Sequence, residues 1–247
     1  MSTTCYLDIN IGDAQRYNDD NAQYQATSAL LSKHASTFDF PPIPEELSEE
    51  QQDILRELHK SPEPLRFTRP VPLLAGRLRF ELDPSPGLAK TRQNFISLCT
   101  GENGFCKNAP NKKLHYAGCP IHRVVQGFVA QGGDVTRGDG SGGESIYGPK
   151  FACEKAGLQT TPSRGSLAMA NSGGKNPVNS SQFFVVLSAD EKALAKLKGK
   201  YVIFGRVKDG DEDGIRVLER LNAVGSRPGS KDGRPLESVW IGDCGLE

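Results

Sequence analysis

The chain has 247 residues, of which 36% are hydrophobic and 24% are charged, and its 30 Lys and Arg residues balance 30 Asp and Glu residues. This composition is ordinary for a soluble globular protein, and the length suits one large domain with an addition. Because the net charge is zero, no overall field would recruit nucleic acid or an anionic membrane, and we expect neither as a partner.

The N-terminal sequence lacks the basic and apolar regions of a signal peptide, and no apolar run approaches the roughly 18 residues of a membrane span. The sequence therefore predicts a cytoplasmic protein, and a location in the nucleus is the alternative. In such a compartment cysteines are expected to be free thiols, since none of them forms a C-x-x-C pair. The six cysteines are Cys5, Cys99, Cys106, Cys119, Cys153 and Cys244.

Residues 5–12 alternate strictly between polar and apolar side chains, which predicts a strand. From 14 to 72 the chain is polar, with helical and proline-rich stretches. A first helix is expected over 18–35, and Ser48 with Gln51 predicts a capping box that opens a second helix. The apolar residues of the second helix share one face: Leu47, Ile54, Leu55 and Leu58. Pro62 and Pro64 then end it.

The remainder of the chain is β-rich. Residues 77–82 alternate again, and a helix is expected over 88–99. Short apolar runs between glycine-rich turns predict strands near 121–125, 128–131, 166–170, 182–187, 201–207 and 238–242. Short helices are expected at 190–197 and 214–221. Many short strands with few helices favour a closed or nearly closed antiparallel barrel with helices at its ends.

One arginine, Arg123, stands in an otherwise apolar, strand-like run, and Gln131 ends the next apolar run. Removing a guanidinium from water is costly, so Arg123 is expected either to have a fixed partner or to face a ligand. A nearby grouping of His115, Cys119 and His122 resembles a metal site. A structural zinc needs four ligands, however, so we expect no metal, and we expect His122 to be a core histidine with a backbone partner.

Five separated segments occur in the order found in one protein family. They are QGFVAQGGD at 126–134, GGESIYG at 142–148, SLAMAN at 166–171, SQFFV at 181–185 and YVIFG at 201–205. Together they resemble the cyclophilins, the cyclosporin-binding class of peptidyl-prolyl cis-trans isomerases. The resemblance implies a mainly β fold, a closed eight-stranded antiparallel barrel capped by two helices and formed by residues 1–13 and 73–247. Residues 14–72 would be a helical, proline-rich insertion.

The resemblance also implies site residues. Arg123, Phe128 and Gln131 would be catalytic. The proline pocket would be lined by Phe128, Val129, Phe184, Leu197 and Tyr201, and the peptide backbone would be bound by Gln131, Ala170, Asn171 and Gln182. Ser141, Ser181 and Lys150 would border the pocket for the residue ahead of the proline. For Phe128 and Phe184, ordinary core packing is the alternative.

The chemistry can also be argued from the residues. An X-Pro bond rotates slowly because amide resonance imposes a barrier of roughly 18–20 kcal/mol. Rotation breaks no bond, so we expect no cofactor, metal or nucleophile. A donor such as Arg123 that is aimed at the prolyl nitrogen favours the twisted state.

Three positions depart from the best-known cyclophilins. Lys196 stands where those members carry a tryptophan that binds cyclosporin, Tyr201 replaces a pocket histidine, and Val129 replaces a methionine. We therefore expect weak cyclosporin binding.

The loop at 107–115 resembles that of the divergent-loop cyclophilins, which also carry residues matching Cys99, Cys244 and Glu144. In that sub-family the two cysteines are proposed to form a redox switch that acts on the loop. The alternative is that both thiols simply pack as small apolar groups.

The insertion at 14–72 stands where the family has a short hairpin turn, and hairpin loops usually have about 2–5 residues. Its helical signals favour a small folded unit that could bind a protein partner. Two functions remain open. One is an isomerase that acts on proline-containing peptides and client proteins and assists their folding. The other is a non-catalytic module that binds proline-containing segments or joins a complex through the insertion.

Overall fold

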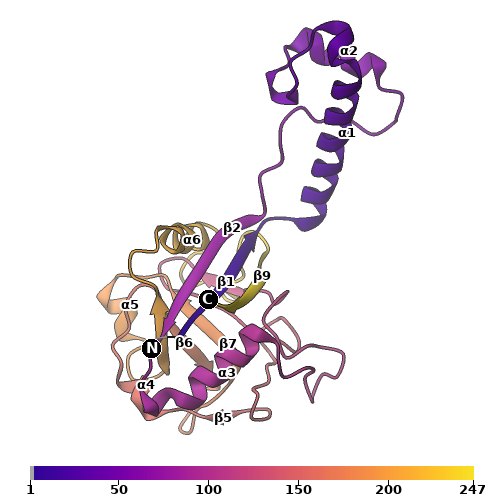
Figure 1. The fold of residues 1–247 in the computed structure, drawn as a ribbon. Coiled ribbons are helices and arrows are strands. Elements are labelled where there is room, and N and C mark those ends of the chain that lie inside the picture. The colour runs from indigo at the N-terminus through magenta and orange to yellow at the C-terminus, as the bar shows by residue number, and fades with distance from the viewer. Residues whose placement is uncertain (1–2) are drawn as a thin grey trace. The chain divides into compact units, whose positions relative to one another are not determined.

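A computed structural model describes residues 3–247, and the chain forms two compact units (Figure 1). The larger unit consists of Met1–Ile11 with Leu74–Glu247, and the smaller unit of Gly12–Leu73. Among the described residues, no helix combines the length and the apolar composition that crossing a membrane requires.

The larger unit is built on one antiparallel sheet of nine strands. Its order along the sheet is β3-β4-β7-β6-β8-β2-β1-β9, and β5 pairs with β7. The strands are β1 (Thr3–Ile11), β2 (Leu74–Leu82), β3 (Arg123–Val125), β4 (Val129–Gly132), β5 (Phe151–Ala152), β6 (Ser166–Asn171), β7 (Val178–Val186), β8 (Ile203–Val207) and β9 (Val239–Leu246). Every strand that the alternation predicts is present, whereas β5 is too short to leave a periodic signal.

The prediction of a closed barrel is wrong, because no ladder joins β3 and β9 at the two ends of the sheet order. Instead, the segment 118–121 before β3 lies against β9, with an isolated bridge between Pro120 and Trp240. The Ile121 N–H donates to the Val239 carbonyl at 2.9 Å. These contacts extend only over this short segment, so the sheet is curled but remains open.

Two longer helices pack on this sheet, α3 (Ala89–Thr100) and α6 (Glu212–Ala223). They fall on the segments predicted as helical, as does the short α5 (Glu191–Ala195). The short α4 (Lys155–Gln159) was not predicted. At the centre of the core, Phe95 of α3 is fully buried and its ring lies 5.3–6.2 Å from four other rings. Those rings belong to Phe80, Tyr116, Phe183 and Phe204.

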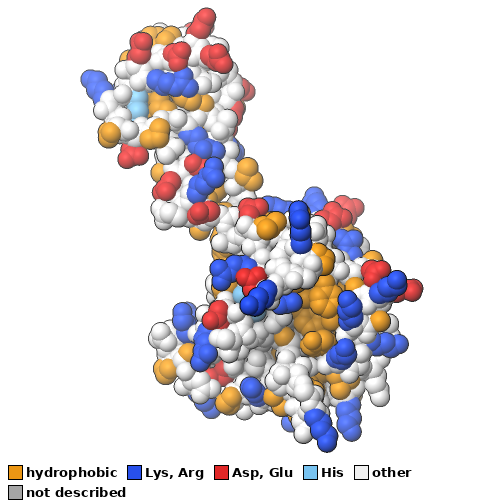
Figure 2. All heavy atoms as spheres, turned by 180° about the vertical axis from the view of Figure 1, so that it is seen from behind, with side chains coloured by type: hydrophobic (Ala, Val, Ile, Leu, Met, Phe, Trp, Pro, Cys, Tyr) orange, Lys and Arg blue, Asp and Glu red, His pale blue; other side chains and the backbone are white. Residues whose placement is uncertain are grey.

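A second, smaller apolar cluster lies on the other face of the sheet. Neighbouring residues of β7 separate the two, since Phe183 belongs to the main core and Phe184 to the second cluster. Successive side chains of a strand point to opposite faces, which explains this division. The buried members of the second cluster are Val129, Ala168, Phe184, Val186, Leu197 and Ile203. Figure 2 shows hydrophobic side chains exposed together on one face of the larger unit, with Lys and Arg around them.

The smaller unit contains α1 (Ala14–Phe38), a short 3-10 turn η1 (Pro44–Glu46) and α2 (Glu49–Leu58). The predicted capping box at Ser48 and Gln51 is present. Helix α1 begins earlier than predicted because the Asp13 side chain accepts a hydrogen bond from the Arg16 N–H at 3.0 Å. The unit has its own buried core, formed by Leu31, Phe40, Leu47, Leu55 and Phe67.

Polar contacts hold the segment after α2 against α1. The Thr27 hydroxyl is fully buried and accepts a hydrogen bond from the Arg66 N–H at 2.9 Å. The Glu45 carboxylate accepts one bond from the Tyr24 hydroxyl at 2.9 Å and another from the Arg69 N–H at 3.0 Å. Residues 12–73 therefore form a folded unit rather than a long irregular loop.

We predict that Leu55→Ala lowers the free energy of unfolding of the smaller unit by about 2–5 kcal/mol, because Leu55 is fully buried in its core. Hydrogen exchange should show faster exchange in α1 and α2. The control is Ile43→Ala. Because the Ile43 side chain is 43% exposed, this change should lower the free energy of unfolding only slightly. Equal protection in the two variants would contradict the assigned core.

Candidate active site

The pairing of three strands places the central side chains of the site in one row. Arg123 of β3 is opposite Gln131 of β4, and Gln131 is opposite Phe184 of β7. Directly paired residues of neighbouring strands lie on the same face of a sheet. The row therefore runs from a cation, through an amide, to an aromatic ring.

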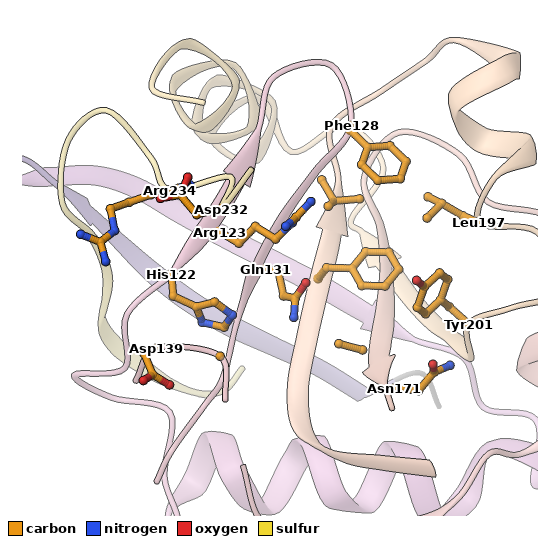
Figure 3. A pocket seen from close by; sticks show the side chains of 14 residues that line it. His122, Arg123, Phe128, Gln131, Asp139, Asn171, Leu197, Tyr201, Asp232 and Arg234 are labelled. Carbon is orange, nitrogen blue, oxygen red and sulfur yellow. The ribbon is translucent and has the colours of Figure 1, made fainter. Parts of the chain in front are cut away.

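This row forms the floor of a pocket of about 410 Å³ (Figure 3). The pocket brings together nine of the residues predicted from sequence: Arg123, Phe128, Val129, Gln131, Ala170, Asn171, Phe184, Leu197 and Tyr201. Five further residues line it that were not predicted to do so: His122, Asp139, Gly140, Asp232 and Arg234. Asp232 and Arg234 carried no signal because their loop is remote in sequence from the other motifs.

One side of the pocket is apolar. The rings of Phe184 and Tyr201 meet edge to face, with centroids 5.0 Å apart. Val129 and Leu197 are buried beside them, and Phe128 is partly buried against the same cluster. Packed walls of this kind give a preformed site for a small apolar group.

Arg123 faces this wall from the polar side of the pocket (Figure 3). Its side chain is half-buried, and its guanidinium makes no hydrogen bond or ion pair with any of residues 3–247. The backbone around it is fixed, because Arg123 pairs with Gln131 and the next N–H, of Val124, donates to the Gly233 carbonyl at 2.8 Å. A half-buried cation whose donors have no partner among residues 3–247 therefore points into the pocket.

The two glutamines are linked. The Gln131 amide nitrogen donates to the Gln182 side-chain oxygen at 2.9 Å. The Gln182 amide in turn donates to the carbonyls of Gly140 and Gly142, at 2.9 and 2.7 Å. Gln182 was predicted to bind the peptide backbone, but both ends of its amide are engaged within the protein. Its observed contacts orient Gln131 and hold the loop beside the pocket.

The end of β6 contributes Ala170 and Asn171 to the pocket. The pairing of β6 with β7 shifts between Met169 and Asn171, so Ala170 is skipped in the ladder. The Asn171 amide donates to the Lys200 carbonyl at 2.7 Å, and its oxygen accepts from the Gly173 N–H. Asn171 thus ties the strand end to the segment that carries Tyr201.

A second pocket of about 300 Å³ adjoins the first, and Ser141, Lys150 and Gln182 line it. The prediction that Ser181 borders this pocket is wrong. Ser181 is fully buried, and its hydroxyl accepts a hydrogen bond from the Glu144 N–H at 3.2 Å. Ser180 lines the pocket instead, because neighbouring residues of β7 face opposite sides.

Asp134, which was not predicted as a site residue, organises a loop that contributes to the lining of both pockets. Its carboxylate is buried and accepts hydrogen bonds from the backbone N–H groups of Thr136, Arg137, Gly140 and Gly142. Burial alone would raise the pKa of Asp134, but these bonds outweigh it and the pKa is lowered. Asp134 therefore remains a carboxylate at neutral pH.

His122 also lines the pocket, and the predicted backbone partner is absent. Its Nδ1 is buried without a hydrogen bond to any of residues 3–247. Burial lowers the pKa of His122, and Arg123 acts in the same direction, whereas Asp134 and Asp139 act against it. His122 is therefore uncharged at neutral pH, which leaves Arg123 as the adjacent cation.

Of the three residues that suggested a metal site, His115 and Cys119 are in contact with each other, whereas His122 lines the pocket. His115 Nε2 lies 3.1 Å from the Cys99 carbonyl and 3.3 Å from the Cys244 sulfur, and the Cys119 thiol donates to the His115 carbonyl. Within residues 3–247, no three His, Cys, Asp or Glu side chains lie together in a way that could hold a metal ion.

Glu144 fixes the loop at 107–115. Its buried carboxylate accepts hydrogen bonds from the backbone N–H groups of Lys107 at 2.7 Å and Asn108 at 2.8 Å. Cys99 and Cys244 are both buried free thiols. Burial raises the pKa of Cys99 and raises that of Cys244 to about 12, which keeps both protonated and slows oxidation. The redox switch stays a prediction.

One comparison with known proteins identifies the family. A family model described as "Cyclophilin type peptidyl-prolyl cis-trans isomerase/CLD" matches residues 71–246, which is more than half of the chain. The chain belongs to this family. The match begins just before β2 and leaves out β1, which the smaller unit separates from the other strands in sequence.

We predict that Glu144→Ala loosens the loop at 107–115. The change leaves the N–H groups of Lys107 and Asn108 without their acceptor, which should cost about 1–3 kcal/mol. Hydrogen exchange measured by mass spectrometry should become faster in this loop. Glu237→Ala, at an exposed position, is the control. Unchanged exchange in the Glu144 variant would show that the carboxylate does not hold the loop.

Proposed function

We propose that this protein is an active peptidyl-prolyl cis-trans isomerase whose catalytic group is Arg123. The observation that carries the proposal is the unpaired guanidinium, half-buried opposite an apolar wall. A cation that only stabilised the fold would have an acceptor, because desolvating it without one is costly. The available acceptor is then a ligand in the pocket.

The proposed reaction follows from the two sides of the pocket. The proline ring packs between Phe128, Phe184 and Leu197, and its imide nitrogen is turned toward Arg123. As the bond twists, the nitrogen lone pair leaves conjugation with the carbonyl, and the N–H groups of Arg123 can donate to it. These bonds are stronger in the twisted state than in the planar ones, so they lower a barrier of roughly 18–20 kcal/mol.

The rest of the pocket holds the peptide while one side rotates. Gln131 is oriented by Gln182 and lies between Arg123 and Phe184. The second pocket, with Ser141 and Lys150 on its walls, is adjacent and suits the residue ahead of the proline. The proposed substrates are proline-containing peptides and client proteins, and isomerisation of their X-Pro bonds would assist the folding of the client proteins.

We predict that Arg123→Ala lowers kcat/KM at least about 100-fold, since removing a donor that acts in the transition state costs this much in other enzymes. The assay is NMR exchange or protease-coupled isomerisation of X-Pro peptides. The matched control is Arg227→Ala, which removes an exposed arginine from a nearby loop. Equal rates for wild type and Arg123→Ala would remove the enzymatic proposal and leave a proline-binding module.

We further propose that cyclosporin binds weakly because Lys196 offers no indole donor at the rim. Lys196 is exposed at the end of α5, immediately before the buried Leu197. Lys196→Trp is expected to tighten the cyclosporin Kd tenfold or more, as buried tryptophans do at binding hot spots. Isothermal titration calorimetry measures the Kd, and Lys198→Trp, at another exposed lysine, is the control. Submicromolar affinity of the unaltered protein would refute the proposal.

A further inference from the structure

The loop between α6 and β9 runs along the free edge of β3. The Ser226 N–H donates to the Val124 carbonyl at 2.9 Å, and the Gln126 N–H donates to the Ser226 carbonyl at 3.0 Å. Further along the loop, the Gly233 carbonyl accepts from the Val124 N–H at 2.8 Å. The strand that carries Arg123 is therefore held on one side by β4 and on the other side by this loop.

Gly233 is the point of this loop that touches the Arg123 side chain. It is buried, and its φ of +65° lies in the left-handed region. A Cβ atom placed there would lie 3.0 Å from Arg123 Cγ and 3.2 Å from the guanidinium carbon Cζ. Carbon atoms are at their optimal separation at about 3.5–4.0 Å, so a side chain at this position would displace the arginine. The glycine backbone thus lies along the length of the arginine.

The Gly233 backbone can orient the Arg123 side chain by contact alone, without occupying its N–H donors. An arginine side chain carries about 2 kcal/mol of rotamer entropy, and an ion pair that restricted it would also occupy the N–H groups. Among residues 3–247, the neighbouring Asp232 forms no ion pair with Arg123, and its Oδ1 accepts from the Arg234 N–H and from the Ser230 hydroxyl, both at 3.3 Å. Figure 3 shows Asp232 and Arg234 on the Arg123 side of the pocket, away from Phe128 and Leu197.

We propose that Gly233 is a positioning residue for Arg123: by lacking a side chain, it lets the loop backbone press the guanidinium into the orientation used for isomerisation. This inference rests on the proposed function of Arg123 and extends it. A displacement of about 1 Å at a catalytic group can reduce a rate about 100-fold, so a single methyl group at this position is sufficient to matter.

The test compares Gly233→Ala with Gly229→Ala. Both glycines belong to the same loop and have positive φ, +65° and +90°, so both variants carry the same kind of backbone strain. A Cβ at Gly229 would have no atom within 4 Å. Gly233→Ala is expected to lower kcat ten- to a hundredfold, with the Kd for an X-Pro peptide changed less than threefold. Gly229→Ala should stay within about twofold of wild type.

A double-mutant cycle separates positioning from a general structural effect. In the background of Arg123→Ala, adding Gly233→Ala should reduce the rate no further, because the group being positioned is gone. An equal reduction with and without the arginine would overturn the inference. If Gly233→Ala does not fold, Gly233→Asn introduces the same Cβ, and Asn tolerates positive φ better than Ala does.

A second readout keeps this inference separate from the proposed function. The Arg123 Nε–H NMR signal should shift in Gly233→Ala and stay unchanged in Gly229→Ala, whether or not the protein is an active isomerase. An inactive wild type with this pattern of shifts would refute the proposed function and support the contact. An unshifted signal in Gly233→Ala, with its activity retained, would overturn the inference.

Discussion

The register of β3, β4 and β7 is the constraint on which the candidate site depends. It places Arg123, Gln131 and Phe184 side by side on one face of the sheet, and sends Phe183 into the core on the other. A slip of one residue would exchange the two faces, burying the cation and exposing the core aromatic. The main core, centred on Phe95, therefore fixes the register that the pocket requires.

Buried or partly buried carboxylates accept hydrogen bonds from backbone N–H groups that no strand pairing or helix satisfies. Asp134 accepts from backbone N–H groups of the loop beside the pocket, Glu144 from the loop at 107–115, and Glu154 from Lys90 and Thr91 at the start of α3. Bonds from N–H groups to a charged acceptor are stronger than those to a neutral one. Irregular segments can therefore be held firmly enough to form the rim of a site.

The smaller unit interrupts the hairpin of β1 and β2 without breaking their pairing. Ile9 is opposite Gly76 and Asn10 is opposite Leu74, so the two points where the unit joins the hairpin are neighbours in the sheet. An insertion is tolerated where its ends are already close together, because it leaves the host's contacts in place. The separate cores of the two units are consistent with this arrangement.

The sequence by itself determined most of the strands and helices, the capping box at Ser48 and most of the residues that line the pocket, because periodicity and motifs are local properties. Only the tertiary structure decided the open sheet and the engagement of Gln182 within the protein. It also brought Gly233 against Arg123, across more than a hundred residues of chain. Alternation along β7 already sets the face of Ser181 opposite to that of Gln182. The other outcomes depend on which distant segment lies beside a residue, and no local pattern encodes that.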